Sequence, residues 1–112
     1  MTDRIDPLLV AAGGFVGATL RYGVGLAVPG VTGTLVVNVL GSFALGAVVA
    51  LMPRHRIQLL VGTGLLSSFT TYSTFAVQTV TLGPELGALN VGANYALGVV
   101  AALLGLAAGR RR

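Results

Sequence analysis

Apolar residues follow one another along this chain in four long runs, separated by short stretches rich in turn-forming residues. A helix needs about 20 apolar residues to cross the hydrocarbon core of a bilayer, and each run is about that long. The pattern predicts transmembrane helices over residues 8–28, 34–52, 57–82 and 86–108. Proline or glycine stands at each junction, as expected where a helix ends and the chain turns.

The predicted connections are only a few residues long, so consecutive helices should run antiparallel. We therefore expect an all-α membrane protein with a single four-helix domain over residues 1–112. An even number of spans places both termini on the same side of the membrane. No large aqueous domain is left to house enzymatic chemistry, and no buried acid–base pair, phosphate loop or metal-ligand cluster is evident. We expect no enzyme.

Composition agrees with a membrane location. Charged residues make up 9% of the 112 residues, hydrophobic residues 54%, and mean hydropathy is +0.90, whereas a soluble domain carries about 25% charged residues. The net charge is +4, but all the arginines except Arg21 stand at the ends of apolar runs, where they match contacts with lipid headgroups. The basic charge thus indicates membrane lipid and not nucleic acid. The chain has no cysteine, which excludes disulfides and thiolate chemistry.

The third run has a polar centre, "SSFTTYSTF" (Ser67–Phe75), in which six of nine residues are serine or threonine. One or two such hydroxyls in a membrane helix usually bond back to the carbonyl one turn earlier. Six hydroxyls are too many for that explanation alone. The β-branched threonines also weaken the helix. We interpret the string as a helix break at mid-membrane. Broken backbone at that depth must be buried in protein or line a polar site, and its free carbonyls would suit a hard cation.

Other polar residues allow two interpretations. Asn38 is expected either to bond another helix or to offer its NH₂ group to an anion, with Thr34 one turn earlier on the same face. Arg21 lies inside the first run and either extends to the near interface or faces an aqueous cavity. Tyr72 and Phe75 either pack in the core or turn their electropositive ring edges toward an anion.

Small residues recur four positions apart, at Gly13 and Gly17, Ser42 and Gly46, and Gly105 and Gly109. Such spacings let helix backbones approach closely. Four helices of this size enclose little interior, so a polar pathway would lie between subunits. We therefore expect an oligomer.

Three motifs together resemble the Fluc (CrcB) family of fluoride channels: "GFVGATLRY" (Gly14–Tyr22), "GTLVVNVLGSFALG" (Gly33–Gly46) and "TTYSTF" (Thr70–Phe75). They follow one another in the family's order and spacing, and the four-segment plan covers the whole chain. The resemblance implies an antiparallel dimer with two fluoride pores and passive fluoride efflux that lowers cytoplasmic fluoride toxicity.

The resemblance also implies site residues. A structural Na⁺, which is not transported, would lie at the dimer centre and be held by the backbone carbonyls of Ser67 and Thr70 in each subunit. The fluoride pathway would carry the side chains of Asn38, Tyr72, Phe75, Thr34, Arg21 and Tyr95.

The chain departs from the family pattern at several positions. Ser67-Ser68 replaces a usual Gly-Gly, which makes the geometry of the break less secure, and Tyr72 replaces a usual phenylalanine. Gln78 stands where the family has glutamate. A serine expected one turn after Tyr95 is missing, so one of the two pores is expected to be altered.

Two other functions compete with the channel. A small multidrug-type transporter of similar length needs a membrane-buried carboxylate, but Asp3, Asp6 and Glu85 all stand at the ends of runs. A non-conducting partner subunit of a heterodimeric fluoride channel stays open, given the departures above.

Arginine distribution predicts the orientation. The side that holds both termini and the second loop carries six arginines: Arg4, Arg54, Arg56 and Arg110–Arg112. The other side's loops carry none, so the positive-inside rule predicts a multi-pass protein of the cell membrane with cytoplasmic termini. An antiparallel homodimer needs both orientations. We therefore favour a heterodimer with an oppositely oriented homologous chain.

Overall fold

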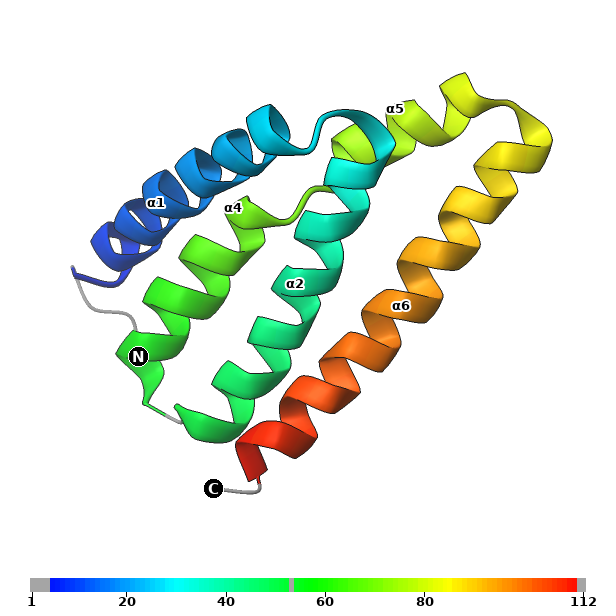
Figure 1. Ribbon diagram of the computed structural model, residues 1–112. Coiled ribbons are helices and arrows are strands. Elements are labelled where there is room, and N and C mark those ends of the chain that lie inside the picture. The colour runs from blue at the N-terminus through cyan, green and yellow to red at the C-terminus, as the bar shows by residue number, and fades with distance from the viewer. Residues whose placement is uncertain (1–4, 53, 111–112) are drawn as a thin grey trace.

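The computed structural model describes residues 5–52 and 54–110, and this part of the chain is helical apart from short connections. The elements are α1 (Ile5–Ala27), α2 (Gly30–Leu51), α3 (His55–Ile57), η1 (Gln58–Leu66), α4 (Ser67–Phe69), α5 (Ser73–Leu82) and α6 (Pro84–Arg110) (Figure 1). The segment η1 is a π-helix, which follows α3 and leads into α4 without interruption.

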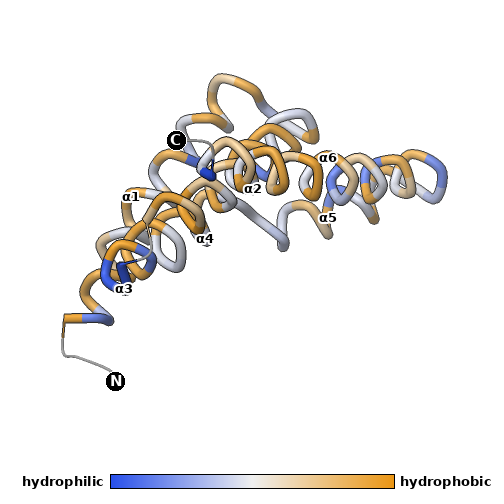
Figure 2. The backbone as a smooth tube through the Cα atoms, turned by 90° about the horizontal axis from the view of Figure 1, so that it is seen from below, coloured by the Kyte–Doolittle hydropathy of each residue, from blue (hydrophilic) through white to orange (hydrophobic). Residues whose placement is uncertain are grey.

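Among the described residues, three helices are long and apolar enough to cross a membrane: α1, α2 and α6. Figure 2 shows hydrophobic residues along most of the length of these helices. The third predicted span, residues 57–82, is instead divided among α3, η1, α4 and α5. The longest of these pieces, α5, has only 10 residues, well short of the roughly 20 that a single span requires.

The helices lie side by side in an order that differs from their order in the chain. In Figure 1, α2 lies between α6 and the η1–α4 segment, and α1 covers the other side of that segment. The helix α5 packs against α6. The start of α1, the short α3 and the end of α6 all lie toward the same end of the bundle.

Glycines allow the closest of these helix contacts. A Cβ atom on Gly17 of α1 would collide with the backbone carbonyl of Leu65 in η1, and Gly13 is in the same situation one turn earlier. On the other side of the bundle, a Cβ atom on Gly46 of α2 would collide with the carbonyl of Ala102 in α6. Backbones therefore touch where the sequence spaces small residues four positions apart.

The helix ends differ by a few residues from the predicted ones. Gly30 and Gly83 adopt positive φ angles of 79° and 89°, which glycine tolerates without steric penalty, so the turns at these positions are short. As a result, α2 begins at Gly30 and not at residue 34, and α6 begins at Pro84 and not at 86. Proline suits the first turn of a helix, where a backbone N–H has no partner in any case.

The helix in the third run is interrupted between Phe69 and Ser73. Thr70 has extended backbone angles, with φ −78° and ψ 165°, and α5 starts three residues later. The hydroxyl oxygen of Thr71 accepts the backbone N–H of Thr74 at 3.2 Å. It thereby satisfies one of the unpaired N–H groups in the first turn of α5, as the side chain of an N-cap residue does.

Candidate ion pathway

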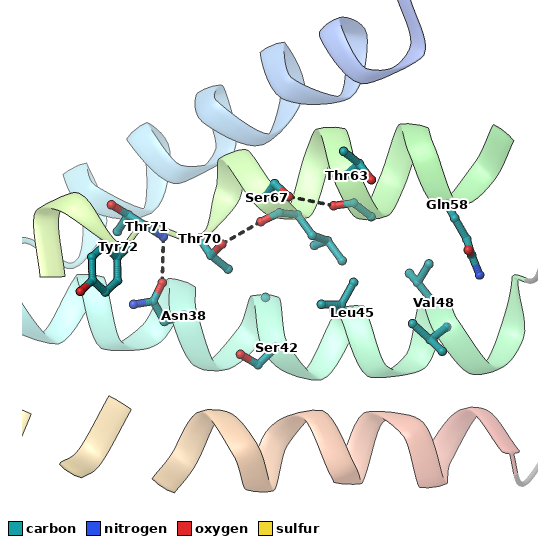
Figure 3. Close-up of a pocket in the computed structure, with 14 residues that line it drawn as sticks. Asn38, Ser42, Leu45, Val48, Gln58, Thr63, Ser67, Thr70, Thr71 and Tyr72 are labelled. Carbon is teal, nitrogen blue, oxygen red and sulfur yellow. Dashed lines mark hydrogen bonds between the residues drawn. The ribbon is translucent and has the colours of Figure 1, made fainter. Parts of the chain in front are cut away.

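Asn38 on α2 lies beside the interruption (Figure 3). Its side-chain oxygen accepts the backbone N–H of Thr71 at 2.9 Å, and its NH₂ group donates to the side-chain oxygen of Asn94 on α6 at 3.1 Å. A backbone N–H can only donate, so it identifies which amide atom of Asn38 is the oxygen. Asn38 thus bonds another helix through one NH₂ hydrogen. The second hydrogen of the same NH₂ group could still be donated to an anion, so the two roles expected from the sequence do not exclude each other.

Cavities surround this amide on two sides. One, of about 530 Å³, lies between α2 and the η1–α4 segment and is bordered by Asn38, Ser67, Thr70 and Tyr72 among others (Figure 3). A second, of about 340 Å³, is bordered by Asn38, Tyr72, Phe75, Asn94 and Tyr95. Four of the predicted pathway residues therefore share one cavity.

Three aromatic rings form a continuous row at this second cavity. The ring centroids of Tyr72 and Phe75 are 5.9 Å apart, and those of Phe75 and Tyr95 are 6.2 Å apart, with the latter two planes at 84°. Phe75 is buried, with 6% of its surface exposed, whereas Tyr72 is 71% exposed. The edge-to-face arrangement directs a ring edge, which carries partial positive charge, at a neighbouring face.

Arg21 and Thr34, the other two predicted pathway residues, border a third cavity of about 310 Å³ together with Thr71 and Gln78. Thr71 borders all three cavities. The structure thus separates Arg21 and Thr34 from the aromatic row and brings the two groups together only through Thr71, a residue that sequence reasoning did not single out.

Arg21 and Thr34 both donate hydrogen bonds to backbone carbonyls of this chain. Arg21 donates from Nε to the carbonyl of Ser68 at 2.9 Å. Thr34 is buried, and its hydroxyl donates to the carbonyl of Gly30 at 3.4 Å. In contrast, the side-chain oxygen of Gln78 is buried without a hydrogen-bond partner among the described residues.

The backbone carbonyls of Ser67 and Thr70 are suited to a hard cation. In an unbroken helix they would accept the N–H groups of Thr71 and Thr74, but these bond to the side chains of Asn38 and Thr71 instead. Among the described residues, neither carbonyl accepts a hydrogen bond. Na⁺-type sites use such oxygen dipoles in place of water, so this donor set fits. Two oxygens alone are too few for a complete shell.

The hydroxyl hydrogens of Ser67 and Thr70 are used within their own helix. Ser67 donates from Oγ to the carbonyl of Gly62 at 3.4 Å, and Thr70 donates from Oγ1 to the carbonyl of Leu66 at 3.0 Å. At these two residues the backbone carbonyls, and not the hydroxyls, are therefore the groups that the described structure leaves without a hydrogen-bond partner. Clusters of three or more His, Cys, Asp or Glu side chains are absent from the described part of the chain.

Sequence reasoning missed Asn90 and Asn94 of α6, which are buried at 7% and 9% exposure. The NH₂ group of Asn94 donates to the backbone and side-chain oxygens of Asn90 at 2.9 and 3.0 Å. The NH₂ group of Asn90 in turn donates to the hydroxyl oxygen of Thr79 at 3.0 Å. Two amides four residues apart in an apolar run share one helix face, and that spacing was the available signal.

His55, the first residue of α3, lies 3.2 Å from the carboxylate of Asp6, measured from Nε2 to Oδ2. Asp6 is buried, with 5% of its surface exposed. The contact joins α3 to the first turn of α1, outside the cavities described above. Of the charges used to predict orientation and to exclude a transporter, Asp3, Arg4, Arg111 and Arg112 lie outside the described residues.

Comparison with known proteins identifies the family. Residues 8–109 match the profile of the "CrcB-like protein, Camphor Resistance (CrcB)" family. The chain is 56% identical to "Fluoride-specific ion channel FluC 1" of Natronomonas pharaonis, over 86% of this chain and 87% of that protein. It is 53% identical to "Fluoride-specific ion channel FluC 1" of Haloarcula marismortui, over 88% and 80%. The chain therefore belongs to the CrcB family of fluoride-specific ion channels, whose members are not enzymes.

Proposed function

We propose that this protein is a multi-pass membrane channel that passes fluoride out of the cell passively. The observation that carries the proposal is the pair of cavities that share Asn38, which bring together an amide NH₂ group, three aromatic rings and hydroxyl groups. These groups can stabilise a small anion by hydrogen bonds and partial charges, without binding it as tightly as a paired full charge would. The names of the relatives support fluoride as the anion.

The described carboxylates argue against a proton-coupled transporter. Asp6 and Glu85 lie in the first turns of α1 and α6, at the ends of the bundle and away from the cavities around Asn38. A carrier that exchanges protons for a cationic substrate needs an ionisable group within the membrane. A passive channel needs none, because hydrogen fluoride enters as a neutral acid and the membrane potential drives the anion out.

The interruption at Thr70–Tyr72 is proposed to lie at mid-membrane, with α3, η1, α4 and α5 completing a fourth crossing. Non-helical backbone at that depth must be shielded by protein or line a polar site. The cavity between α2 and the η1–α4 segment leaves Ser67 and Tyr72 exposed. A second subunit packed antiparallel over this face would cover them, and we propose such a dimer.

Na⁺ is proposed as a structural cofactor at the centre of that dimer. The carbonyls of Ser67 and Thr70 from each of two subunits would supply four oxygens to it. When bound, the ion supplies a fixed positive charge that holds the two interruptions together. The backbone of this chain contributes the orientation of these carbonyls, which follows from the diversion of the Thr71 and Thr74 N–H groups to side chains.

A heterodimer is proposed in preference to a homodimer, and one observation favours a non-conducting role for this chain within it. The second cavity is bordered by Gly98 and Val99 beyond Tyr95, so α6 supplies no hydroxyl there, and the nearby hydroxyl comes from Ser42 of α2 instead. A partner chain with an intact track would then carry most of the current.

Fluoride efflux from liposomes tests the proposal. The purified chain is reconstituted alone in vesicles loaded with potassium fluoride, and efflux is started with a potassium ionophore and followed with a fluoride electrode. Parallel vesicles loaded with chloride give the selectivity. Fluoride release without chloride release supports the channel. Equal release of both anions, or release only under an imposed proton gradient, contradicts it. Release only after co-reconstitution with an inverted homologous chain supports the heterodimer.

A further inference from the structure

The amide of Asn38 is one end of a chain of hydrogen bonds that crosses three helices. From α2 it leads to Asn94 and Asn90 on α6, then to Thr79 on α5, whose hydroxyl donates to the carbonyl of Phe75 at 2.9 Å. We call Asn94, Asn90 and Thr79 the amide ladder. It connects two residues of the proposed pathway, Asn38 and Phe75, that lie on different helices.

Backbone groups fix the direction of every bond in the amide ladder. At one end, the N–H of Thr71 can only donate, so it requires the oxygen of Asn38. At the other end, the carbonyls of Asn90 and Phe75 can only accept, so they require the NH₂ group of Asn94 and the hydroxyl hydrogen of Thr79. With both ends fixed, each amide between them donates with nitrogen and accepts with oxygen in the same sense. Aligned bonds of this kind strengthen one another in a low dielectric.

We infer that Asn94 is a positioning residue for the anion pathway, which fixes the orientation of the Asn38 amide through bonds anchored on Asn90 and Thr79. The inference rests on the proposed function, because it assumes that the second hydrogen of the Asn38 NH₂ group faces the anion. One NH₂ hydrogen is engaged by Asn94, and the oxygen is held by Thr71. A rotated amide would present an oxygen, which repels an anion.

Burial explains why this arrangement is stable. Asn90 and Asn94 are 7% and 9% exposed in the described structure, so an amide that loses its partner there has little water to replace it. Leaving a buried polar group unsatisfied costs about twice the net worth of an ordinary hydrogen bond. Removing Asn94 therefore leaves the NH₂ group of Asn38 without its acceptor, and the bond from the Thr71 N–H is then the one hydrogen bond among the described residues that still holds this amide.

A double-mutant cycle separates positioning from general structural support. Fluoride efflux is measured for Asn94→Leu, Asn38→Ala and the double variant. The expected loss in Asn94→Leu is about tenfold, as for one unsatisfied buried group. If Asn94 acts through Asn38, the double variant should match Asn38→Ala alone, because the target of positioning is already gone. Losses that multiply in the double variant would overturn the inference.

Two threonines of α5 provide a matched pair that is less disruptive. Both donate to the carbonyl four residues earlier, Thr79 to Phe75 and Thr81 to Val77, but only Thr79 also accepts from Asn90. Thr79→Val should lower the fluoride-to-chloride selectivity of efflux severalfold, whereas Thr81→Val should leave it unchanged. Equal effects of the two substitutions would mean that the amide ladder has no special part in selectivity.

Hydrogen exchange tests the positioning role of Asn94 without measuring ion transport, so its result does not depend on the proposed function. Hydrogen exchange at the backbone N–H of Thr71 is measured by mass spectrometry in detergent. In Asn94→Leu, faster exchange at Thr71 is expected, because its acceptor Asn38 is no longer held, while exchange in α1 stays unchanged. Unchanged exchange at Thr71 contradicts positioning. If the unaltered protein conducts no fluoride, the proposed function fails, and the exchange result still decides the role of Asn94.

Discussion

Arg21 donates a hydrogen bond from Nε to the backbone carbonyl of Ser68, 2.9 Å away and 47 residues later in the chain. Ser68 lies in α4, which ends at Phe69, so its carbonyl belongs to the last turn of an interrupted helix. A cation at this position satisfies an otherwise unpaired carbonyl and opposes the negative end of the helix dipole. Arg21 therefore stabilises the end of α4 at the interruption. This structural role is separate from the role in the fluoride pathway that the resemblance implies.

Replacing Arg21 tests this structural part. Arg21→Met should lower stability, because the Ser68 carbonyl loses a charged donor, an interaction worth about 1.5–3 kcal/mol. Arg21→Gln retains a neutral donor and should lose less. Thermal unfolding followed by size-exclusion chromatography in detergent gives the order of the three proteins. A Met variant as stable as the unaltered protein, with only its fluoride conduction reduced, would contradict the capping role.

Gly17 and Gly23 form a matched pair on α1 for testing the contact with η1. A Cβ atom at Gly17 meets the backbone of Leu65, which cannot move aside like a side chain, whereas a Cβ atom at Gly23 meets nothing within 4 Å. We expect Gly17→Ala to separate α1 from η1 and to lower the unfolding temperature. Gly23→Ala should be neutral or slightly stabilising, as glycine-to-alanine changes in helices are. Similar melting of both variants would show that this contact tolerates extra volume.

Ser67 tests whether carbonyls or hydroxyls serve the proposed Na⁺ site. The Ser67 hydroxyl donates to Gly62, and its carbonyl accepts no hydrogen bond within the part of the chain that the structure describes, so Ser67→Gly should keep fluoride efflux and its dependence on Na⁺. Ser67→Pro should abolish both, because the backbone N–H of Ser67 bonds to the carbonyls of Gly62 and Gly64 and proline has none. The two variants are compared by measuring fluoride efflux in Na⁺ and again after Na⁺ is replaced by a large organic cation. Lost activity in the glycine variant would assign the ligand to the hydroxyl.

Helix positions were predictable from sequence because each depends on a local signal, a long apolar run ended by proline or glycine. The partners of Asn38 were not predictable, since the distance to Asn94 depends on how α2 and α6 pack, which is decided by glycines such as Gly46. The π-helical geometry of η1 carries no periodic signal that separates it from an α-helix over nine residues. For the same reason, the division of the third run into several helices was anticipated only at its hydroxyl-rich centre.

The side on which the termini lie determines which dimer can form. Arg54 precedes α3 and Arg110 ends α6, and both are exposed. The start of α1, α3 and the end of α6 lie toward the same end of the bundle, as expected for a cytoplasmic side under the positive-inside rule. Because the chain has no cysteine, a single cysteine added after Arg112 reports topology without interference. We expect a membrane-impermeant maleimide to label it only after the cells are opened.

Charge removal provides the control for that experiment. Substituting Arg54 and Arg56 by alanine weakens the bias of the second loop, and labelling from outside should then increase because fewer positive charges hold this side in the cytoplasm. An unchanged pattern would mean that other features set the orientation. Comparable labelling from both faces in the unaltered sequence would contradict a fixed orientation and restore a dual-topology homodimer. Labelling from the cytoplasm alone would require an inverted partner, because two copies with the same orientation cannot form the antiparallel dimer proposed above.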